Sequence, residues 1–544
     1  MKKLICALLA LLLCAALLAG CGGKSAGSGK ASGAFPAEMA VLLTDRPAAP
    51  SVGNERVFYE IFVGSFSDSD GDGSGDLRGI INRMDYLNDG DADSGKSLGV
   101  EGLWLTPIFA SPSYHKYDVT DYYAIDPAFG TLDDLRELCA LCHERGVLVI
   151  LDLPINHTGS RNEWFKNFCE AHRSGDESSE WYGFYSFCRK GEEPEGRRFR
   201  QIDGCDDMYE CNFSDDMPEL DLDNEAVRAE VLKVARFYLE LGVDGFRFDA
   251  IKYADFGDHP SSAAFWEWYM DELRAIRSDV YAVGECWDDD SVILQYCGSM
   301  NCFCFSVSQS YGYIAEAASG GEVRPYTDYV ESWYGRVRAI RPDASYVPFV
   351  TNHDMDRAAG MLGTAGGMQM AANLYILGPG SPFIYYGEEL GLRGSRGGSG
   401  TDANRRLAMP WGDGDKVADP EGADYDKADR VPADAAVQQS DPNSLYNYYR
   451  GLIAIRRANP EIAGGECVSL DLGDSPLGGF VFTADSGAVC VIHNTGHETR
   501  TVELPAIGGR EFTVLAARAG LGEAMLEDGV LTLGPRTSVV LREG

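Results

Sequence analysis

Short runs of β-branched and aromatic residues recur from about residue 57 to residue 390, and amphipathic stretches often follow them. The eight runs are 57–66, 102–109, 147–156, 243–251, 280–287, 300–307, 346–354 and 382–390. Helical spacing of apolar residues is clear in 132–145 and 225–241. Eight β-then-α units predict an α/β fold, a (β/α)8 TIM barrel. A doubly wound sheet is the alternative, but polar residues gather at the carboxyl ends of the runs, where barrel active sites form.

Two regions depart from this alternation. Residues 158–223 are rich in Gly, Asp, Cys and aromatic residues and are too long for an ordinary βα loop, which predicts a small inserted domain after the third strand. After about residue 459 the helical pattern gives way to short strand-like runs separated by turns, which favours a C-terminal β-sandwich. We therefore expect the barrel in 51–157 and 224–455 and the sandwich in 456–544.

The N-terminus has the organisation of an export signal. A basic start, Met1-Lys2-Lys3, precedes an apolar run over 4–18 that is too short for a comfortable membrane span. The sequence Leu18-Ala19-Gly20-Cys21 resembles a bacterial lipobox, which implies cleavage before Cys21 and diacylation of its thiol; a plain secretory signal is the alternative. Residues 22–50 begin Gly/Ser-rich and are expected to be a flexible tether. The expected location is extracytoplasmic, lipid-anchored to the bacterial cell membrane.

The charge of the chain narrows the choice of partners. The 544 residues carry a formal net charge of −37. Such a chain should repel nucleic acid and anionic membranes, so a neutral, hydroxyl-rich substrate fits better. Acidity that only keeps an exported protein soluble is the alternative. We expect no nucleic-acid partner, membrane contact only through the lipid anchor, and a monomer. The chain has 15 cysteines, whose pairing the sequence does not determine.

The fourth and fifth runs end in residues suited to acid–base and nucleophilic chemistry. Arg247 and Asp249 are two apart, so their side chains share one face of a strand. An arginine beside a carboxylate should lower its pKa and keep it ionised, as a nucleophile requires. Glu285 follows an apolar strand beside aromatic residues, which would raise its pKa and let it act as an acid. Taken alone, the first pair could be a structural ion pair.

Histidines complete the pattern at two other strand ends, His157 and His353. The segments LDLPINHTG, GFRFDAIKY, VGECW and FVTNHD resemble, in order, the four signature regions of the α-amylase family, glycoside hydrolase family 13. The resemblance implies a retaining glycoside hydrolase. It assigns roles as follows: Asp249 as nucleophile, Glu285 as general acid/base, Asp354 as the third carboxylate, Arg247, His157 and His353 as sugar-binding residues, and Tyr117 as the tyrosine that stacks on the sugar.

Acidic residues alternate with glycines after the first strand. Carboxylates at alternate positions let a loop wrap a hard cation through oxygen ligands. The segment 68–76 resembles the calcium loop of many family members, whereas a solvated acidic turn is the alternative. The expected cofactor is therefore calcium, and the expected ligands are Asp68, Asp70, Asp72, Asp76 and a main-chain carbonyl near Ser74.

Residues near the motifs bear on specificity. Ala250 and Lys252 resemble those of enzymes that act on α-1,4 links, which implies that Lys252 contacts sugars on the leaving side. Exo-acting α-glucosidases of the family carry an aspartate where this chain has Tyr114, although Arg406 resembles their arginine partner. We expect an α-amylase acting on starch, glycogen or malto-oligosaccharides. An exo-α-glucosidase or oligo-1,6-glucosidase, a transglycosylase, and a catalytically inactive glucan-binding lipoprotein are the alternatives.

Overall fold

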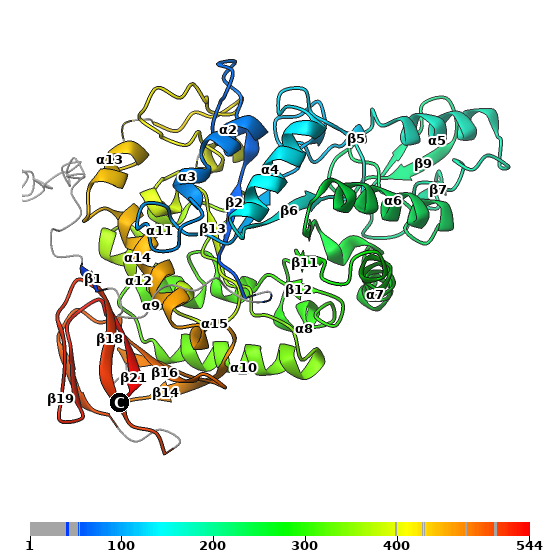
Figure 1. Cartoon of the computed structure of the whole chain (residues 1–544). Helices are drawn as coiled ribbons and strands as arrows, with labels where there is room; N and C mark the ends of the chain where they lie inside the picture. The colour runs from blue at the N-terminus through cyan, green and yellow to red at the C-terminus, as the bar shows by residue number, and fades with distance from the viewer. Residues whose placement is uncertain are drawn as a thin grey trace, which may run out of the picture.

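A computed structural model describes residues 40–42, 53, 55–397, 400–426, 428, 430–473, 476–504 and 509–544. Its centre is a parallel sheet of seven strands in the order β12-β11-β10-β6-β3-β2-β13 (Figure 1). Their bounds are β2 (Phe58–Ile61), β3 (Gly102–Leu105), β6 (Leu148–Leu153), β10 (Gly245–Phe248), β11 (Tyr281–Gly284), β12 (Asn301–Cys302) and β13 (Phe383–Tyr385). Each strand lies inside one of the predicted runs.

The remaining barrel position is filled by a segment with little regular pairing. The run 346–354 forms no extended strand; Val347 makes a parallel bridge to Phe303, and Phe349 makes one to Phe383. Pro348 lies between them and has no N–H to donate, so a continuous ladder is interrupted there. The two bridges join the two ends of the sheet. The predicted (β/α)8 TIM barrel is confirmed, and the expectation of a full seventh strand is wrong.

Helices surround the sheet in the expected alternation. Their bounds are α2 (Leu77–Asn82), α3 (Met84–Leu87), α4 (Leu132–Glu144), α6 (Glu225–Leu241), α7 (His259–Ile276), α8 (Asp290–Ile293), α9 (Tyr313–Ala318), α10 (Arg324–Ile340), α11 (Ala358–Leu362), α12 (Ala365–Ile376), α13 (Ala435–Ser440), α14 (Leu445–Ala458) and α15 (Glu461–Gly464). The helix α4 begins with a capping box between Thr131 and Asp134, which satisfies amide groups at its first turn. Both helices predicted from apolar spacing are present.

Aromatic side chains fill the barrel interior. The ring of Phe58 lies 4.6 Å from that of Phe383 and 4.7 Å from that of Tyr281, centroid to centroid. Trp104 packs against the ring of Phe383 as well. A Cβ at Gly102 would come within 2.3 Å of the Phe58 ring, so glycine is required where this ring meets the neighbouring strand. The barrel is thus a packed core, and polar chemistry is confined to its end.

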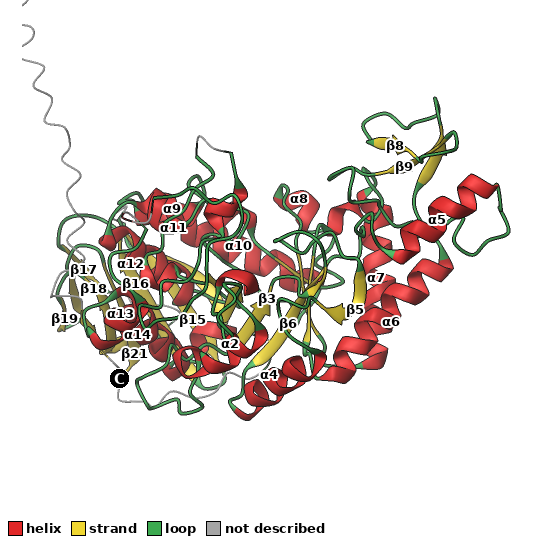
Figure 2. Cartoon of the chain, turned by 90° about the horizontal axis from the view of Figure 1, so that it is seen from above, coloured by secondary structure: helices red, strands yellow, loops and turns green. Residues whose placement is uncertain are grey.

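An inserted segment after β6 forms its own small sheet. The helix α5 (Glu163–Ser174) precedes three antiparallel strands in the order β7-β9-β8, with bounds β7 (Phe187–Arg189), β8 (Phe199–Gln201) and β9 (Asp207–Glu210). A bridge between His157 and Glu219 ties the two ends of this segment together beside the barrel. In Figures 1 and 2, α5 and this sheet lie at one end of the molecule, opposite the C-terminal sheets.

The C-terminal region consists of two antiparallel sheets. One has the order β1-β18-β21-β16-β15-β14, and the other has the order β17-β20-β19. The bounds are β14 (Glu466–Asp471), β15 (Leu477–Ala484), β16 (Gly487–Asn494), β17 (Arg500–Glu503), β18 (Phe512–Gly520), β19 (Ala524–Glu527), β20 (Val530–Leu533) and β21 (Thr537–Glu543). Leu531 and Leu533 of the small sheet share a buried cluster with Val481 and Ile492 of the large one, which gives the predicted sandwich its core.

One strand of the large sheet comes from the N-terminal side of the chain. The strand β1 (Ala40–Leu42) pairs antiparallel with β18, where Ala40 faces Gly520. These three residues fall in the predicted tether, so the expectation of an unpaired tether does not hold for them. A short apolar run, Ala-Val-Leu, can add to a sheet edge because the backbone supplies the pairing. The predicted lipid-bearing Cys21 lies outside the described residues.

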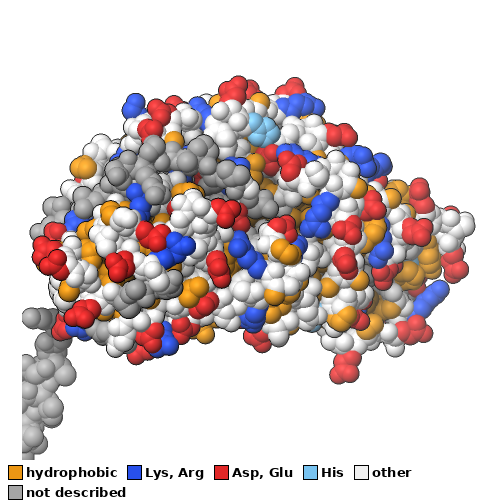
Figure 3. Space-filling model, turned by 60° about the horizontal axis from the view of Figure 1, so that its bottom comes forward, with side chains coloured by type: hydrophobic (Ala, Val, Ile, Leu, Met, Phe, Trp, Pro, Cys, Tyr) orange, Lys and Arg blue, Asp and Glu red, His pale blue; other side chains and the backbone are white. Residues whose placement is uncertain are grey.

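On the face in Figure 3, acidic and basic side chains are interspersed. None of the helices within the described residues is both long enough and apolar enough to span a bilayer. All twelve cysteines of the described residues have free thiols, including Cys139 and Cys142, which are buried on α4.

Candidate active site

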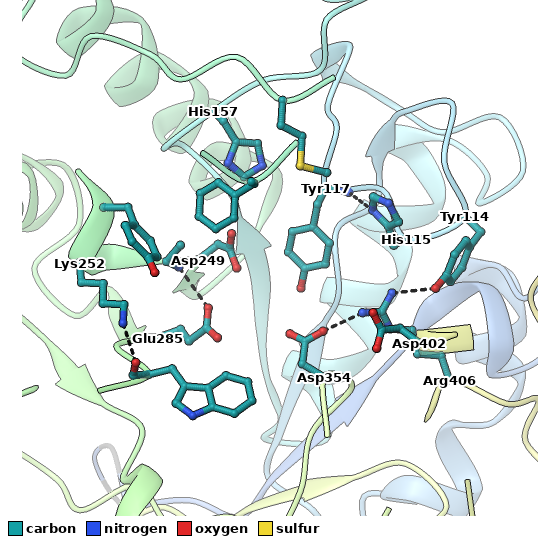
Figure 4. Close-up of a pocket in the computed structure, with 15 residues that line it drawn as sticks. Tyr114, His115, Tyr117, His157, Asp249, Lys252, Glu285, Asp354, Asp402 and Arg406 are labelled. Carbon is teal, nitrogen blue, oxygen red and sulfur yellow. Dashed lines mark hydrogen bonds and ion pairs between the residues drawn. The ribbon is translucent and has the colours of Figure 1, made fainter. Parts of the chain in front are cut away.

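Two neighbouring strands bring Asp249 and Glu285 together. In the parallel ladder of β10 and β11, Phe248 pairs with Gly284, so the residues that follow lie at the same level. The amide of Glu285 donates to the carbonyl of Phe248 at 2.9 Å, and the amide of Ala250 donates to Glu285 Oε2 at 3.2 Å. Both acidic side chains line one cavity of about 610 Å³ at this end of the barrel (Figure 4).

The backbone turns sharply after Asp249. Ala250 has φ 49° and ψ 42°, the left-handed conformation that non-glycine residues rarely adopt. Such a residue costs about 1–3 kcal/mol and persists only where the surroundings enforce it. Here the turn directs the Ala250 amide at Glu285, so Oε2 of that carboxyl is occupied. A proton on Glu285 is therefore carried by Oε1.

Arg247 lies beneath these groups, fully buried. Its Nη1 is 2.7 Å from both Asp152 Oδ1 and Asp249 Oδ1, and its Nη2 is 2.9 Å from Glu285 Oε2. The guanidinium also lies over the Trp104 ring, 5.2 Å from its centroid. One positive charge is therefore shared by three carboxyl groups.

Burial dominates the ionisation of the two neighbouring carboxyl groups. It raises the pKa of Glu285 to about 7, although Arg247 acts in the opposite direction. It also raises the pKa of Asp249 above its ordinary value, because the attraction of Arg247 does not offset the desolvation. The expectation that Arg247 lowers the pKa of Asp249 overall is thus wrong, while the raised pKa of Glu285 is as expected.

A third carboxylate lies on the opposite side of the cavity. Burial alone would raise the pKa of Asp354, but His353 and Arg406 outweigh it and hold the pKa well below its usual range. His353 Nε2 is 3.0 Å from Asp354 Oδ2, and Arg406 Nη2 is 2.7 Å from Asp354 Oδ1. In Figure 4, Asp354 and Arg406 face Glu285 and Lys252 across the cavity. Asp354 is therefore held as an anion.

Arg406 joins Asp354 to the wall of the cavity. Its Nη1 donates to the Tyr114 hydroxyl at 3.1 Å, and its Nε donates to the carbonyl of His353 at 3.1 Å. Asp402, at the start of a 3-10 turn, lines the cavity on the same side. The residue pair noted in the sequence, Tyr114 and Arg406, is thus in direct contact.

The opposite wall carries Lys252 and several aromatic rings. Lys252 Nζ donates to the carbonyl of Trp287 at 2.7 Å and lies 2.9 Å from Asp288 Oδ2. Trp287 and Phe213 are 39% and 41% exposed, and both line the cavity. Phe213, from the inserted segment, packs edge-on against Tyr253. Because this wall adjoins Glu285, it is the side on which a leaving group protonated by Glu285 would lie.

Tyr117 and His157 also line the cavity, as expected. The Tyr117 hydroxyl donates to Asp152 Oδ2 at 2.9 Å and lies 2.7 Å from His353 Nε2. Burial lowers the pKa of His157 to about 4, so its imidazole is neutral. Every sugar-site residue expected from the sequence lines this cavity or, for Arg247 and His353, is buried directly beneath it.

The acidic loop lies apart from this cavity. Ligand atoms of Asp68, Asp70 and Asp76 lie within 4.8 Å of one another. Three carboxylates at this spacing suit calcium, which binds six to eight oxygens. Asp72 does not belong to this group; its carboxylate instead accepts from the amide of Ser74 at 2.7 Å. The structure therefore gathers three of the four carboxylates expected.

Sequence reasoning missed several residues of the site. Met217, Trp287, Phe213, Tyr253, His115 and Asp402 line the cavity but were not predicted to do so. Most come from loops whose course the strand pattern does not specify. Glu60 was missed as well, although a charged residue inside an apolar strand run is itself a signal.

A TIM barrel with acidic residues on neighbouring strand ends, an arginine between them and a third carboxylate opposite has the architecture of a glycoside hydrolase. Comparisons with known proteins agree. The sequence matches the α-amylase catalytic domain over residues 60–465. The chain belongs to the α-amylase family, glycoside hydrolase family 13, and is a glycosidase.

Three relatives illustrate the range of the family. The chain is 33% identical to α-amylase 3 of Dictyoglomus thermophilum, over 89% of this chain and 93% of that protein. It is 28% identical to an oligo-1,6-glucosidase of Bacillus cereus, over 90% and 98%. The solved structure of Eubacterium rectale Amy13B superposes with a TM-score of 0.84 at 32% identity, covering 92% of this chain and 97% of that one. These relatives share one family and include both an α-amylase and an oligo-1,6-glucosidase.

Proposed function

We propose that this protein is an α-amylase that hydrolyses α-1,4-glucosidic bonds in starch, glycogen or malto-oligosaccharides with retention of configuration. The observation that carries the proposal is the pair Asp249 and Glu285, level on adjacent strands and joined through Arg247. Retaining glycosidases need one carboxylate to attack and one carboxylic acid to protonate the leaving oxygen. Likeness to an α-amylase over most of both chains supports the same assignment.

The first chemical step follows from the ionisation of the pair. Glu285 gives the proton of Oε1 to the glycosidic oxygen, the bond to the anomeric carbon breaks, and a carboxylate oxygen of Asp249 bonds to that carbon. Asp354, held as an anion, accepts hydrogen bonds from sugar hydroxyls as positive charge develops on the ring. Arg247, bonded to Asp249 and close to Glu285, keeps both carboxyl groups in place.

The second step reverses these roles. Glu285, now a carboxylate, takes a proton from water while the water oxygen bonds to the anomeric carbon. The bond to Asp249 breaks, and Asp249 leaves as a carboxylate. Two inversions at one carbon give net retention. The neutral His157 and the Tyr117 ring line the space for the sugar at the cleavage point.

The wall near Asp354 favours endo action. Tyr114 presents a neutral phenol beside Arg406, where an aspartate would fix the terminal sugar of an exo-enzyme. The cavity has a volume of about 610 Å³, within the range of roughly 300–1,000 Å³ typical of ligand pockets. This volume leaves room for atoms beyond a single bound sugar ring. The alternative, exo-α-glucosidase or oligo-1,6-glucosidase action, is supported by the contact of Arg406 with Asp354.

Transfer to a sugar acceptor is a second candidate activity. Phe213 and Trp287 expose about two-fifths of their surface along the leaving-group wall. Aromatic faces hold sugars well because they combine apolar area with a fixed geometry. An acceptor sugar bound there would compete with water for the glycosyl-enzyme, and products longer than the substrate would reveal it.

Two further proposals concern the setting of the enzyme. We propose calcium at Asp68, Asp70 and Asp76, where it would hold the loop before α2 and supply a structural charge rather than a chemical step. We also propose a monomer attached through a lipid on Cys21 to the outer side of a bacterial cell membrane, on the strength of the N-terminal sequence alone.

The decisive test is timed hydrolysis of soluble starch, pullulan and maltoheptaose, with products separated by size. We expect a rapid fall in starch chain length and short malto-oligosaccharides as products. Asp249→Asn, which keeps the side-chain shape and removes the nucleophilic charge, should abolish both. Glucose appearing while long chains persist would move the assignment to an exo-α-glucosidase. No turnover of any α-glucan, with binding intact, would overturn the proposal and favour a glucan-binding lipoprotein.

A further inference from the structure

Glu60 is a buried acid within the barrel. It is the third residue of β2 and is 1% exposed. A charged side chain is rarely buried unless a partner compensates for its lost hydration. Its partner is distant in sequence: Glu60 Oε1 lies 2.6 Å from Nδ1 of His353 and also accepts from the His353 amide at 3.3 Å.

The other ring nitrogen of His353, Nε2, also faces hydrogen-bond acceptors. Nε2 lies 3.0 Å from Asp354 Oδ2 and 2.7 Å from the Tyr117 hydroxyl. Tyr117 gives its only hydroxyl proton to Asp152, so this hydroxyl must accept from Nε2. A neutral imidazole has only one N–H, so it cannot donate both from Nδ1 to Glu60 and from Nε2 to Asp354 and Tyr117. With Glu60 ionised, both ring nitrogens face acceptors, and the contacts fit a doubly protonated ring.

Charges of both signs surround the His353 ring. Asp152 from β6 adds negative charge near the ring, whereas Arg247 from β10 and Arg406 add positive charge. Trp104 from β3 packs edge-on against the imidazole and brings no charge. Burial alone would lower the pKa of His353, but Asp354 and Glu60 outweigh burial and raise it to about 10.

We propose that Glu60 is a positioning residue for glycosidic cleavage, which holds His353 as an imidazolium with its Nε2–H directed at Asp354. This role rests on the glycosidase activity of the family and is independent of the choice between endo and exo action. Glu60 touches no reacting atom. It acts through His353 on the carboxylate that lies across the cavity from Glu285.

The substitution Glu60→Gln separates charge from hydrogen bonding. The amide oxygen can still accept from Nδ1 of His353, so the ring stays in place, but the negative charge is gone. The His353 backbone amide donates to the same side-chain oxygen, which keeps an acceptor facing the ring in Glu60→Gln. When the ring then loses a proton, Nδ1 keeps its hydrogen and Nε2 becomes a bare lone pair 3.0 Å from Asp354. Two acceptors at that distance repel, so Asp354 is displaced and the cleavage step slows.

The test is the pH dependence of kcat/KM on α-maltosyl fluoride. Fluoride leaves without protonation, so Glu285 adds no alkaline limb and the limb that remains reports on the other groups. We expect the alkaline limb of Glu60→Gln to lie about two pH units below that of the unchanged enzyme, with a loss of about tenfold at pH 9. Superimposable profiles would overturn the proposal.

Two controls isolate the effect. Tyr59→Phe alters the neighbouring residue on the opposite face of β2, where the Tyr59 hydroxyl donates to buried Glu389; it should lower the unfolding temperature and leave the pH profile unchanged. In a His353→Gln background, Glu60→Gln should change kcat/KM by less than about threefold. A further tenfold loss in that background would mean that Glu60 acts elsewhere, and the proposal would fail.

Discussion

At the scale of single residues, Arg247 governs the ionisation of the carboxyl groups proposed to act in catalysis. Its one charge is spread over Asp152, Asp249 and Glu285. Spread in this way, it does not overcome the desolvation of either Asp249 or Glu285, so the pKa of each is raised. Asp354 differs because it has His353 and Arg406 beside it. The site thus holds one carboxylate with a lowered pKa, Asp354, and two carboxyl groups with raised pKa values, Asp249 and Glu285.

This division predicts a bell-shaped pH dependence of kcat/KM on maltoheptaose. Asp249 must be ionised to attack, so activity rises with pH through its raised pKa, and the acid limb lies above the ordinary range of aspartate. Glu285 must be protonated, so activity falls with pH through a value near 7. Initial rates between pH 3 and 10 measure both limbs, which belong to the coupled pair rather than to one residue each.

A matched substrate checks which limb belongs to Glu285. With α-maltosyl fluoride the limb near pH 7 should vanish from kcat/KM, and Glu285→Gln should lose far less activity on the fluoride than on maltoheptaose, by about a hundredfold or more. An alkaline limb near pH 7 that persists on the fluoride would contradict the assignment of Glu285 as the acid.

Residues within strand-end motifs were predictable because each motif carries its own context. Asp249 and Arg247 are two residues apart on one strand, so the sequence alone specifies that they share a face. The raised pKa of Asp249 was not predictable, because it results from burial in the folded barrel and from Asp152 and Asp354, which lie far from Asp249 in the sequence. Glu60 was not predicted as a residue of the site for a related reason, since its partner His353 is 293 residues away in the sequence.

At the scale of elements, the segment 68–76 links a loop to a helix. Asp76 is the N-cap of α2, where its carboxylate accepts from the Gly79 amide at 2.6 Å, and its other oxygen accepts from the Ser69 amide. Asp70 is exposed and adds only a local bond to the Asp72 amide. A cation here would therefore stabilise an element boundary, and Asp70 is the ligand whose loss disturbs the fold least.

This arrangement predicts that a calcium chelator lowers the unfolding temperature of the protein. A ligand at a free concentration of 100 times its Kd stabilises by about 2.7 kcal/mol. Asp70→Ala should unfold early with or without chelator, because the variant no longer binds the ion. The control Asp91→Ala, in another exposed acidic loop, should retain the full response. A response of equal size in Asp70→Ala would exclude this loop as the site.

Element types followed from the sequence more closely than pairing did. The helices α4 and α6 match the predicted spans to within one residue at their ends, because caps such as Thr131 and Asn224 are local signals. Pro348 was visible too, but the run around it was apolar enough to predict a strand. The run forms only two bridges because pairing depends on which of its amides face the neighbouring strands. That arrangement is a property of the closed barrel.

At the scale of the whole molecule, the sandwich is joined to the barrel by buried polar contacts. Asn373 of α12 is fully buried, and its Nδ2 donates to the carbonyl of Ala519 at 3.2 Å and to Ser538 Oγ at 2.9 Å. Its Oδ1 accepts from the Tyr448 hydroxyl of α14 at 2.8 Å. One side chain thus connects two barrel helices to two strands of the large sheet. Such contacts favour a single cooperative unit.

We therefore expect Asn373→Leu to lower the stability of barrel and sandwich together. The substitution keeps the volume but leaves buried groups unpaired, each at a cost of about 1–3 kcal/mol. Denaturant unfolding followed by both circular dichroism and residual activity should give midpoints that shift together. The control Thr501→Val alters the exposed face of β17, and its free energy of unfolding should stay within about 0.5 kcal/mol of that of the unchanged protein. If the spectroscopic transition splits while the activity midpoint stays, the sandwich unfolds on its own, and the buried amide is a local contact rather than a link between the two halves.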